Sequence, residues 1–473
     1  MKTLTESEKV LILGGGISGL ALAWFLHRRG VTVEVLEAGA RPGGTIRTET
    51  IQGYQVELGP NSTLQKPGER EDALGRLVTE LALADRLVEA APTAARRYVM
   101  RHGRLLPLPA SPPAFLRTSI FSPLAKLRLL KEPFVGWVDH EENIAEFVRR
   151  RLGREFLDYA IEPFISGVYA GNPRDLSVQA AVPKIHDLEQ RWGSLIFGAV
   201  MTGKAKKAMG APRGRLISFD AGMELLPATV AARLPKGVVR CGLEVVDLRV
   251  RPEGGWRVEW KNGAGERGFE QADRVILAMP AHAAAKVLFS SVPGASRVLS
   301  SIGYAPIASV ALGYAREKMG HSLDGFGFLL PRREQIRTLG ALFNSTLFSG
   351  RAPAGKALVT AFIGGAMDGA ALTMPEDALA AWVKKDLVRC LGVSAEPEFL
   401  HMTRYQAAIP QYHVGHLKRL AVLDQVLEGH PGIATQANWR GGVSVYDCVW
   451  NAECLAKRLI GEEIPEDLGG MPA

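Results

Sequence analysis

The chain has 473 residues, more than one ordinary hydrophobic core contains, so we expect two or three domains. Its composition, 47% hydrophobic and 22% charged, is that of a globular protein, and because no apolar run approaches the roughly 18 residues of a membrane span, any membrane contact must be peripheral. The net charge of +8 is consistent with solubility alone, an anionic membrane surface or a polyanionic substrate; no nucleic-acid-binding motif is present, and four scattered cysteines argue against a disulfide framework or a zinc site.

The first predicted elements form one strand–helix–strand unit, with strands at 9–13 and 31–37 and an apolar helix at 17–29. The turn after the first strand satisfies G-x-G-x-x-G, whose glycines let the backbone approach a pyrophosphate at the helix N-terminus. Glu37 ends the second strand, where an acid accepts hydrogen bonds from ribose hydroxyls and disfavours a 2′-phosphate. The residues expected to bind a dinucleotide here are Gly14, Gly15, Gly16, Ile17, Ser18, Gly19 and Glu37.

A second glycine-rich segment follows Glu37 directly and bears on which dinucleotide is bound, because the first motif alone leaves FAD and NAD open. It contains Arg41, Gly43, Gly44 and Thr45, and a rigid glycine loop with an arginine can hold a further stretch of a long, extended cofactor. This pattern resembles the second FAD signature of the amine oxidase and phytoene desaturase superfamily. We therefore expect FAD.

The rest of the chain alternates between helical and strand patterns. Residues 41–62 are predicted as a glycine-studded loop, and helical patterning dominates from about 70 to 210. Strand patterns return at 214–290, 308–314 and 357–363, with an amphipathic helix near 376–391. A last strand at 432–437 leads through a glycine turn into a helix at about 444–460, so the nucleotide fold is predicted to be assembled from three separated pieces of chain.

These patterns predict an α/β protein with α+β insertions and three domains. A discontinuous Rossmann-like FAD-binding domain is expected to comprise residues 1–75, 214–290 and 428–473. A mixed-sheet substrate-binding domain is expected at 76–90 and 291–427, and a mainly helical domain at 91–213.

Short motifs spread along the chain resemble the oxygen-dependent, FAD-containing protoporphyrinogen oxidases, from about residue 9 to 460. They are ELGPNS at 57–62, RRYV at 96–99, LPASP at 108–112, EPFISGVYAGN at 162–172, GFGFL at 325–329, IPQY at 409–412 and GVSVYDC at 442–448. Each motif is short, but the order and spacing that the motifs share with that family make the whole set specific. One departure is Ala437, which stands where that family usually has a glycine, with Trp439 and Arg440 following it.

The resemblance implies roles for individual residues. Arg97 matches the arginine that binds a substrate propionate, although the neighbouring Arg96 could take that role. Leu329 and Phe348 match residues that sandwich a pyrrole ring, and Gly167 matches a glycine that faces the macrocycle. The further implied FAD contacts are Gly59, Pro60, Asn61, Ser62, Val245, Gly442, Val443, Ser444 and Val445. No acid–base catalyst and no metal ligand is assigned.

The implied function is oxidation of protoporphyrinogen IX to protoporphyrin IX by three successive hydride transfers to FAD, with O2 as the final acceptor and H2O2 as product. A rival function within the same fold is that of the coproporphyrin-forming coproporphyrinogen III oxidase, whose substrate carries four propionates and should require extra cations. A second rival is an oxidase of the same superfamily acting on amines or carotenes, and a third is a non-enzymatic flavin-binding scaffold that docks on membranes.

The expected partners are a porphyrinogen and O2, with a homodimer left open and nucleic acid excluded. The expected location is the cytoplasm, because the N-terminus lacks a signal-peptide pattern and the cysteines indicate a reducing compartment. Peripheral membrane contact is suggested by the net charge and by the apolar and basic stretch 115–130, which includes Arg117, Lys126 and Arg128. That stretch could equally pack on the protein itself.

Overall fold

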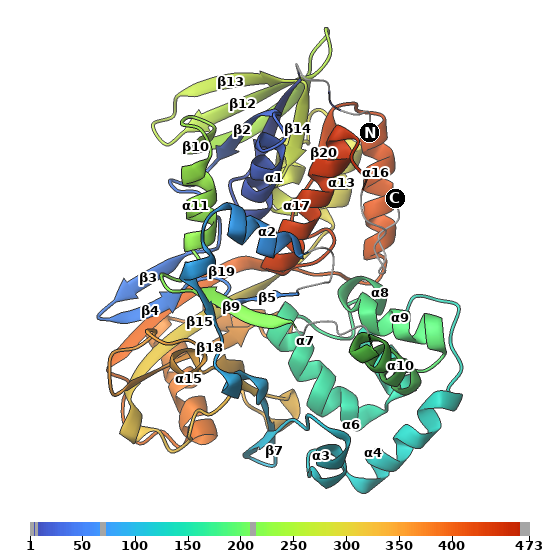
Figure 1. Cartoon of the computed structure of the whole chain (residues 1–473), viewed down its shortest axis with the longest axis vertical. Coiled ribbons are helices and arrows are strands. Elements are labelled where there is room, and N and C mark those ends of the chain that lie inside the picture. The colour runs from blue at the N-terminus through green and yellow to red at the C-terminus, as the bar shows by residue number, and fades with distance from the viewer. Residues whose placement is uncertain (1–3, 5–7, 67–71, 209–213, 464–473) are drawn as a thin grey trace.

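The first strand lies at the centre of a five-stranded parallel sheet built from separated parts of the chain (Figure 1). The computed structural model describes Leu4 and residues 8–66, 72–208 and 214–463. In sheet order the strands are β10 (Val239–Cys241), β2 (Thr32–Glu37), β1 (Lys9–Leu13), β14 (Arg274–Leu277) and β20 (Ile433–Thr435). The discontinuous dinucleotide fold expected from the sequence is confirmed.

Side chains of β1 pack alternately in two different cores, because successive side chains of a strand point to opposite faces of the sheet. Val10 and Ile12 pack in the core that contains α1 and α17, whereas Leu11 and Leu13 pack in the core on the opposite face of the sheet. The helices on the first side are α1 (Ile17–His27), α2 (Ala73–Glu80), α11 (Leu225–Arg233) and α17 (Val445–Ile460), and those on the second are α12 (Ala281–Val287), α13 (Pro293–Ser300) and α16 (His416–Glu428).

A mixed sheet of seven strands forms the lower left of Figure 1, with α15 (Glu376–Leu391) packed against it. Its order is β19 (Phe399–Pro410), β15 (Tyr304–Ala315), β18 (Lys356–Gly364), β17 (Thr338–Leu342), β16 (Gly327–Leu329), β7 (Tyr98–Arg101) and β8 (Arg104–Pro107). All pairs are antiparallel except β16 with β7. A short helix, α14 (Asn344–Leu347), connects β17 to β18.

The remaining strands of the described residues form three smaller sheets. They are β11 (Leu243–Val250), β12 (Trp256–Asn262) and β13 (Arg267–Ala272); the hairpin β3 (Thr48–Ile51) and β4 (Tyr54–Glu57); and β5 (Thr63–Gln65), β9 (Arg215–Phe219) and β6 (Leu87–Glu89). The hairpin β3–β4 lies within 41–62, which the sequence pattern presents as loop. The loop prediction was wrong for these residues. Two strands of only four residues each, flanked by glycines, give too short a pattern to be recognised as strands.

Helices form the lower right of Figure 1. They are α3 (Pro112–Arg117), α4 (Pro123–Arg128), η4 (Leu129–Phe134), α5 (Ile144–Arg151), α6 (Arg154–Phe156), η5 (Leu157–Ile161), α7 (Glu162–Tyr169), α8 (Val178–Ala181), α9 (Pro183–Trp192) and α10 (Leu195–Ala208). The strand pairing departs from the expected ranges at two places: β7 and β8 belong to the seven-stranded sheet, and β6 pairs with β9.

Strands β7 and β6 are short and pair with β16 and β9, which lie more than 100 residues away along the chain, so local sequence does not reveal these pairings. Strand β8 joins the seven-stranded sheet as the hairpin partner of β7.

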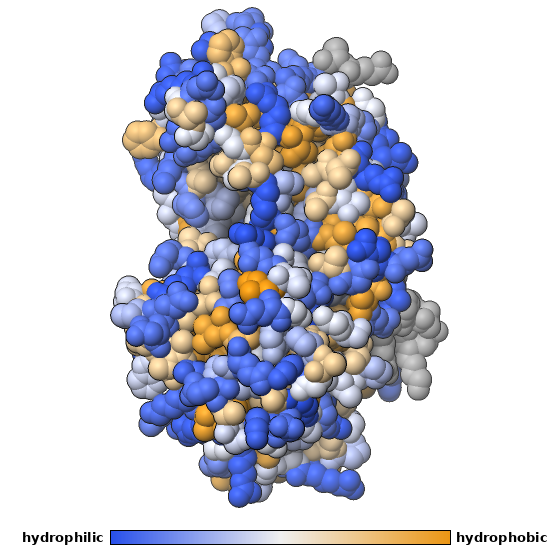
Figure 2. All heavy atoms as spheres, turned by 90° about the vertical axis from the view of Figure 1, so that its left-hand side faces the viewer, coloured by the Kyte–Doolittle hydropathy of each residue, from blue (hydrophilic) through white to orange (hydrophobic). Residues whose placement is uncertain are grey.

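The side of the molecule that carries β3, β4 and β10 is mainly hydrophilic, with apolar residues in small groups (Figure 2). Within the described ranges, no helix combines the length and the apolar character needed to cross a bilayer.

Candidate flavin and substrate site

The first glycine loop, residues 14–19, joins β1 to α1. Its glycines differ in how closely other atoms approach them. Gly14 has φ +114°, and a Cβ there would lie 2.6 Å from the carbonyl oxygen of Ala278. A Cβ on Gly19 would overlap the carbonyl oxygen of Gly14. A Cβ on Gly16 would instead meet nothing within 4 Å. The loop is therefore closed against the protein on one side and open at Gly16, where α1 begins.

Glu37 is held at the end of β2 by two backbone amides. The Gly15 amide donates to Glu37 Oε2 at 2.6 Å, and the Gly39 amide donates to Oε1 at 2.7 Å. These bonds place the carboxylate beside the first glycine loop, where the sequence predicts ribose contact. Val245 lies on β11, and the Gly242 amide just before this strand donates to the carbonyl oxygen of Gly39, which brings β11 to the same corner.

The second glycine loop, residues 39–46, touches the first. The Gly43 amide donates to the carbonyl oxygen of Gly15 at 2.7 Å, and Gly16 and Gly43 form an isolated parallel bridge. Arg41 donates to the carbonyl oxygens of Pro42, Ile46 and Gly44 and pairs with Glu224 at 3.4 Å. Arg41 thus stabilises the second glycine loop through hydrogen bonds within it. Its predicted contact with phosphate stays a prediction.

Residues 59–62 follow β4 and lie against the second glycine loop. A Cβ on Gly59 would overlap the carbonyl oxygen of Thr45, so only glycine permits this approach. Asn61 is buried, and its Oδ1 accepts from Nδ2 of Asn344 at 2.6 Å. The predicted cofactor residues Thr45, Gly59 and Asn61 are therefore brought together, with Pro60 and Ser62 in the same short run.

The N-terminus of α17 is shaped by a serine cap and two glycines. Ser444 Oγ accepts from the Asp447 amide at 3.1 Å and donates to Asp447 Oδ2 at 2.6 Å. Gly442 has φ +126°, and its missing Cβ leaves room for the Asp447 carboxylate. The predicted residues Gly442, Val443, Ser444 and Val445 are thus the entry to a capped helix whose Val445 side packs in the α1 core.

The unusual residues after β20 fasten this entry to its surroundings. Trp439 is fully buried, and its indole N–H donates to the carbonyl oxygen of Met279. Arg440 pairs with both oxygens of Asp424, at 2.6 and 2.9 Å. Ala437 is 5% exposed and packs in the core on the second face of the sheet. These contacts give the unusual residues 437–440 a structural role, because they fasten the chain between β20 and α17 to its surroundings.

Tyr412 and His416 are the residues of this region that sequence reasoning left without a role. The Tyr412 hydroxyl donates to the carbonyl oxygen of Asn438 at 2.6 Å and accepts from the Gly442 amide at 3.0 Å. The His416 ring stacks on it at 4.3 Å and its Nε2 contacts the carbonyl oxygen of Trp439 at 2.9 Å. Only the IPQY motif signalled Tyr412, because its contacts lie across the fold.

The chain fits a flavin dinucleotide. The N-terminus of α1 has no side-chain cap and no acidic residue in its first turn, so its amides and positive dipole end are available to an anion. The open space at Gly16 lies where the two glycine loops meet. The residues that would hold the diphosphate are those of the two loops, and Glu37 would hold the ribose.

The predicted substrate residues lie between α7 and the seven-stranded sheet. Gly167 of α7 faces β16, because a Cβ there would lie 2.7 Å from Leu329 Cδ2. Leu329 pairs with Val99 of β7, and Arg97 directly precedes that strand. Gly167, Leu329 and the Arg97 strand are therefore brought to one place.

Arg96 and Arg97 differ in what they contact. Arg96 forms an ion pair with Asp324, whose carboxylate also accepts from the Tyr98 hydroxyl at 2.8 Å. Arg97 is exposed, and its guanidinium lies 5.1 Å from the centre of the Phe326 ring. Within the described residues Arg97 has no carboxylate partner, so of the two arginines it is the one available to an anion.

Phe348 lies at the end of α14 and is 2% exposed. Its ring is 5.5 Å from the guanidinium of Arg351, which is itself buried. No contact links Phe348 to Leu329 among the described ones, so their pairing around a pyrrole stays a prediction.

The fold and the two glycine loops define an FAD-dependent oxidoreductase. A scan of protein families matches residues 17–445 to the flavin containing amine oxidoreductases, and the chain belongs to this family.

Curated relatives cover almost the whole chain. Protoporphyrinogen oxidase 2, chloroplastic/mitochondrial, of Arabidopsis thaliana is 31% identical over 96% of this chain and 94% of its own length. Protoporphyrinogen oxidase 1, chloroplastic, of the same plant is 34% identical, covering 95% and 87%. Coproporphyrinogen III oxidase of Bacillus subtilis (strain 168) is 29% identical, covering 94% and 97%.

A solved structure matches the fold over nearly all of the chain. The crystal structure of a "Putative protoporphyrinogen oxidase" from Exiguobacterium sp. 255-15 matches with a TM-score of 0.80 and 26% identity, covering 97% of this chain and 99% of that one.

Proposed function

We propose that this protein oxidises protoporphyrinogen IX to protoporphyrin IX. The observation that carries the proposal is Arg97, an exposed cation without a carboxylate partner in the described part of the chain, at the edge of the Gly167–Leu329 contact. A porphyrinogen is a large apolar ring system with carboxylate side chains, so its site needs apolar walls and a cation at one edge.

The reaction removes six electrons and six hydrogens from the substrate and converts three O2 into three H2O2. When bound, FAD supplies a two-electron acceptor that O2 reoxidises. The chain's own part is binding and orientation: Arg97 would pair with a propionate, and Leu329 would exclude water from one face of the macrocycle. No side chain is assigned as a base, since water can accept the protons released.

Protoporphyrinogen IX carries two propionates and coproporphyrinogen III carries four. One observation favours the first substrate. Of the two arginines at the predicted edge, Arg96 is paired with Asp324 and only Arg97 is available to a propionate.

Anaerobic bleaching of the flavin absorption by each porphyrinogen tests the proposal. We expect the second-order rate constant of flavin reduction, the limiting rate divided by the apparent Kd, to be at least about tenfold higher with protoporphyrinogen. Equal or faster bleaching by coproporphyrinogen would contradict it.

We further propose that the enzyme docks on an anionic membrane surface through its helical region. Six large apolar side chains between residues 116 and 137 are at least 60% exposed: Leu116, Leu124, Leu127, Leu130, Phe134 and Trp137. Four more on α9 and α10 are at least 37% exposed: Trp192, Ile196, Phe197 and Val200. Arg117, Lys131 and Lys204 are exposed in the same segments and complement anionic headgroups.

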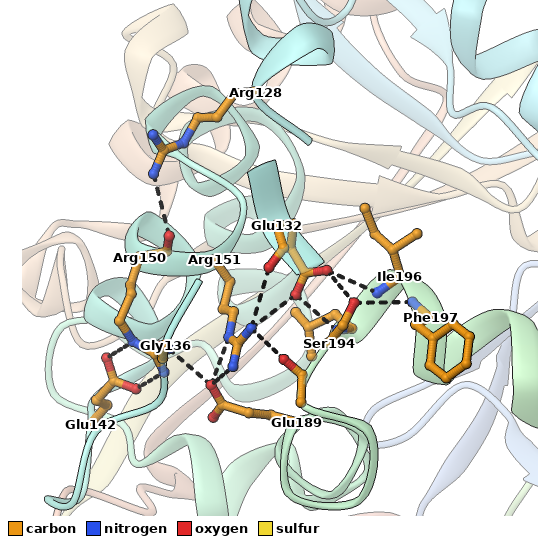
Figure 3. A network of polar contacts seen from close by, with 12 residues as sticks. Arg128, Glu132, Gly136, Glu142, Arg150, Arg151, Glu189, Ser194, Ile196 and Phe197 are labelled. Atoms are coloured by element: carbon orange, nitrogen blue, oxygen red, sulfur yellow. Dashed lines mark hydrogen bonds and ion pairs between the residues drawn. The ribbon is translucent and has the colours of Figure 1, made fainter. Parts of the chain in front are cut away.

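A buried ion network holds these two apolar segments together (Figure 3). Glu132 of η4 accepts from Ser194 Oγ at 2.5 Å and from the Leu195 amide at 2.9 Å, while Arg151 of α5 binds both Glu132 and Glu189. The side chains of Glu132 and Arg151 are 0% exposed. The network therefore fixes η4 against the start of α10 and supports a common docking surface.

Flotation with vesicles containing phosphatidylglycerol tests this docking. We expect the wild type to float with the vesicles and Leu124→Glu/Leu127→Glu to stay in solution. Phe289→Glu, a matched change of a 73% exposed side chain outside the helical region, should float normally. Flotation of the double variant equal to wild type, or no flotation of the wild type, would contradict the proposal.

A further inference from the structure

Glu57 and Arg351 form a buried ion pair between the cofactor run and the predicted substrate wall. Their side chains are 2% and 3% exposed, and Arg351 Nη1 lies 3.3 Å from Glu57 Oε1. Arg351 Nη2 also donates to Ser218 Oγ at 2.6 Å and to the carbonyl oxygen of Phe219 at 3.1 Å. Burying two charges costs desolvation free energy that an apolar pair would avoid, so their presence calls for a reason other than stability.

On the cofactor side, Glu57 is the last residue of β4, two positions before Gly59. Its Oε2 accepts from Thr48 Oγ1 at 2.7 Å and its Oε1 accepts from the Met223 amide at 3.0 Å. The Thr48 amide in turn donates to Glu224, which pairs with Arg41 of the second glycine loop. The carboxylate therefore fixes the start of the Gly59–Ser62 run to the loop that precedes it.

On the substrate side, Arg351 lies three residues after Phe348. Its guanidinium is 5.5 Å from the centre of the Phe348 ring, and its carbonyl oxygen accepts from the Gln55 amide at 3.1 Å. Arg351 thus connects the ring of Phe348 with β4 through both its side chain and its backbone.

We propose that Glu57 and Arg351 are a positioning pair that fixes the ring of Phe348 relative to the flavin-lining run Gly59–Ser62 and thereby sets the affinity for the porphyrinogen. Neither residue is assigned contact with the substrate; both act through Phe348. The inference rests on the proposed function in that it takes Phe348 as a substrate contact.

The pair also predicts a pH dependence. Burial, opposed by Thr48, Arg351 and the Met223 amide and reinforced by Glu224, raises the pKa of Glu57 from 4.5 to about 6. Burial lowers the pKa of Arg351, against the opposing effect of Glu57 and Asp220. Glu57 is therefore ionised above about pH 6, and below it the neutral carboxyl no longer balances Arg351. Substrate affinity should fall as the pH drops through this value.

The experiment compares Glu57→Gln with wild type as purified holoenzyme. Stopped-flow flavin reduction by protoporphyrinogen without oxygen yields an apparent substrate Kd and a limiting rate. We expect the variant to raise the apparent Kd about tenfold and to change the limiting rate less than about twofold, because the ring is displaced while the flavin is kept. Wild-type Kd should rise below about pH 6, and that of the variant should not.

Two controls separate positioning from general stability. Glu453→Gln makes the same change at another buried carboxylate paired with an arginine, Arg76, and should leave the apparent Kd unchanged. The Glu57→Gln/Arg351→Met variant removes both charges, so it should fold even where the single variant does not, and its apparent Kd should still be raised.

A double-mutant cycle tests the route through Phe348. Phe348→Leu should raise the apparent Kd by itself, and adding Glu57→Gln should then change it less than about twofold. A Glu57→Gln holoenzyme that melts earlier but keeps the wild-type Kd and pH profile would overturn the proposal, as would full additivity with Phe348→Leu.

A measurement without substrate keeps this test apart from the proposed reaction. The visible circular dichroism of bound FAD should titrate with a midpoint near pH 6 in wild type and not in Glu57→Gln. If the wild-type flavin is not reduced by a porphyrinogen, the proposed function fails, while this titration still supports or refutes the positioning role.

Discussion

Arg96 and Arg97 are adjacent in the chain, yet only Arg97 lacks a carboxylate partner among the described residues. We expect Arg97→Leu to raise KM for the porphyrinogen about 10- to 100-fold with little change in kcat, because a charge-assisted hydrogen bond contributes about 1.5–3 kcal/mol. Arg96→Leu is the matched control and should change KM less than about threefold. Steady-state porphyrin fluorescence measures both, and equal effects of the two variants would refute the assignment.

His416 should make stability fall in acid. Burial, the largest effect, lowers the pKa of His416 from 6.5 to about 4, so the folded protein keeps the ring neutral. The unfolded chain takes up a proton below its ordinary pKa of about 6.5, so the stabilisation is present above that pH and is lost as the pH falls toward 4. The loss reaches about 3 kcal/mol at pH 4.

Urea denaturation at a series of pH values measures this loss. His416→Phe keeps a ring against Tyr412 but cannot titrate, so its free energy of unfolding should fall less steeply between about pH 6.5 and 4. Parallel curves for variant and wild type would show that His416 is not the group responsible.

At the scale of elements, the helical region depends on the network of Glu132, Arg151 and Glu189. Arg151→Met leaves the buried Glu132 carboxylate without its cation, a change that costs about 3–5 kcal/mol, whereas Glu189 keeps its ion pair with Arg150 at 2.9 Å. We expect proteolytic cleavage within residues 112–208 to become faster while the visible flavin spectrum is retained, because the two glycine loops lie outside this region. Limited proteolysis followed by mass spectrometry locates the cuts; cleavage spread evenly over the chain would contradict a local effect.

At the scale of the whole molecule, FAD should act as a structural link. Its predicted contacts come from residues 14–62, 245 and 442–445, which are separate parts of the chain joined in one site. Free FAD at about 100 times its Kd should stabilise the folded state by about 2.7 kcal/mol. Thermal unfolding of apoprotein at increasing FAD concentrations measures this, and a melting temperature independent of FAD would contradict the fold-based assignment of the cofactor.

The sequence by itself determined the cofactor fold and the elements around it. The first glycine loop, Glu37 and the helix at 445–460 were predictable because each depends on neighbours within a few residues: a tight turn, a strand end, a 3.6-residue periodicity. The resemblance to a known family added Gly167, Leu329 and Arg97 as candidates and left the choice between Arg96 and Arg97 open.

Only the tertiary structure showed which of the two arginines is paired with a carboxylate, and it showed contacts of residues without a predicted role. Asp324 pairs with Arg96 across 228 residues of chain, Tyr412 binds the loop before α17, and Arg351 reaches Glu57 from the loop before β18. Ion pairs and buried hydrogen bonds of this kind join residues that are distant in sequence and leave no periodic signal. They follow from how the sheets and helices pack, which local pattern does not specify.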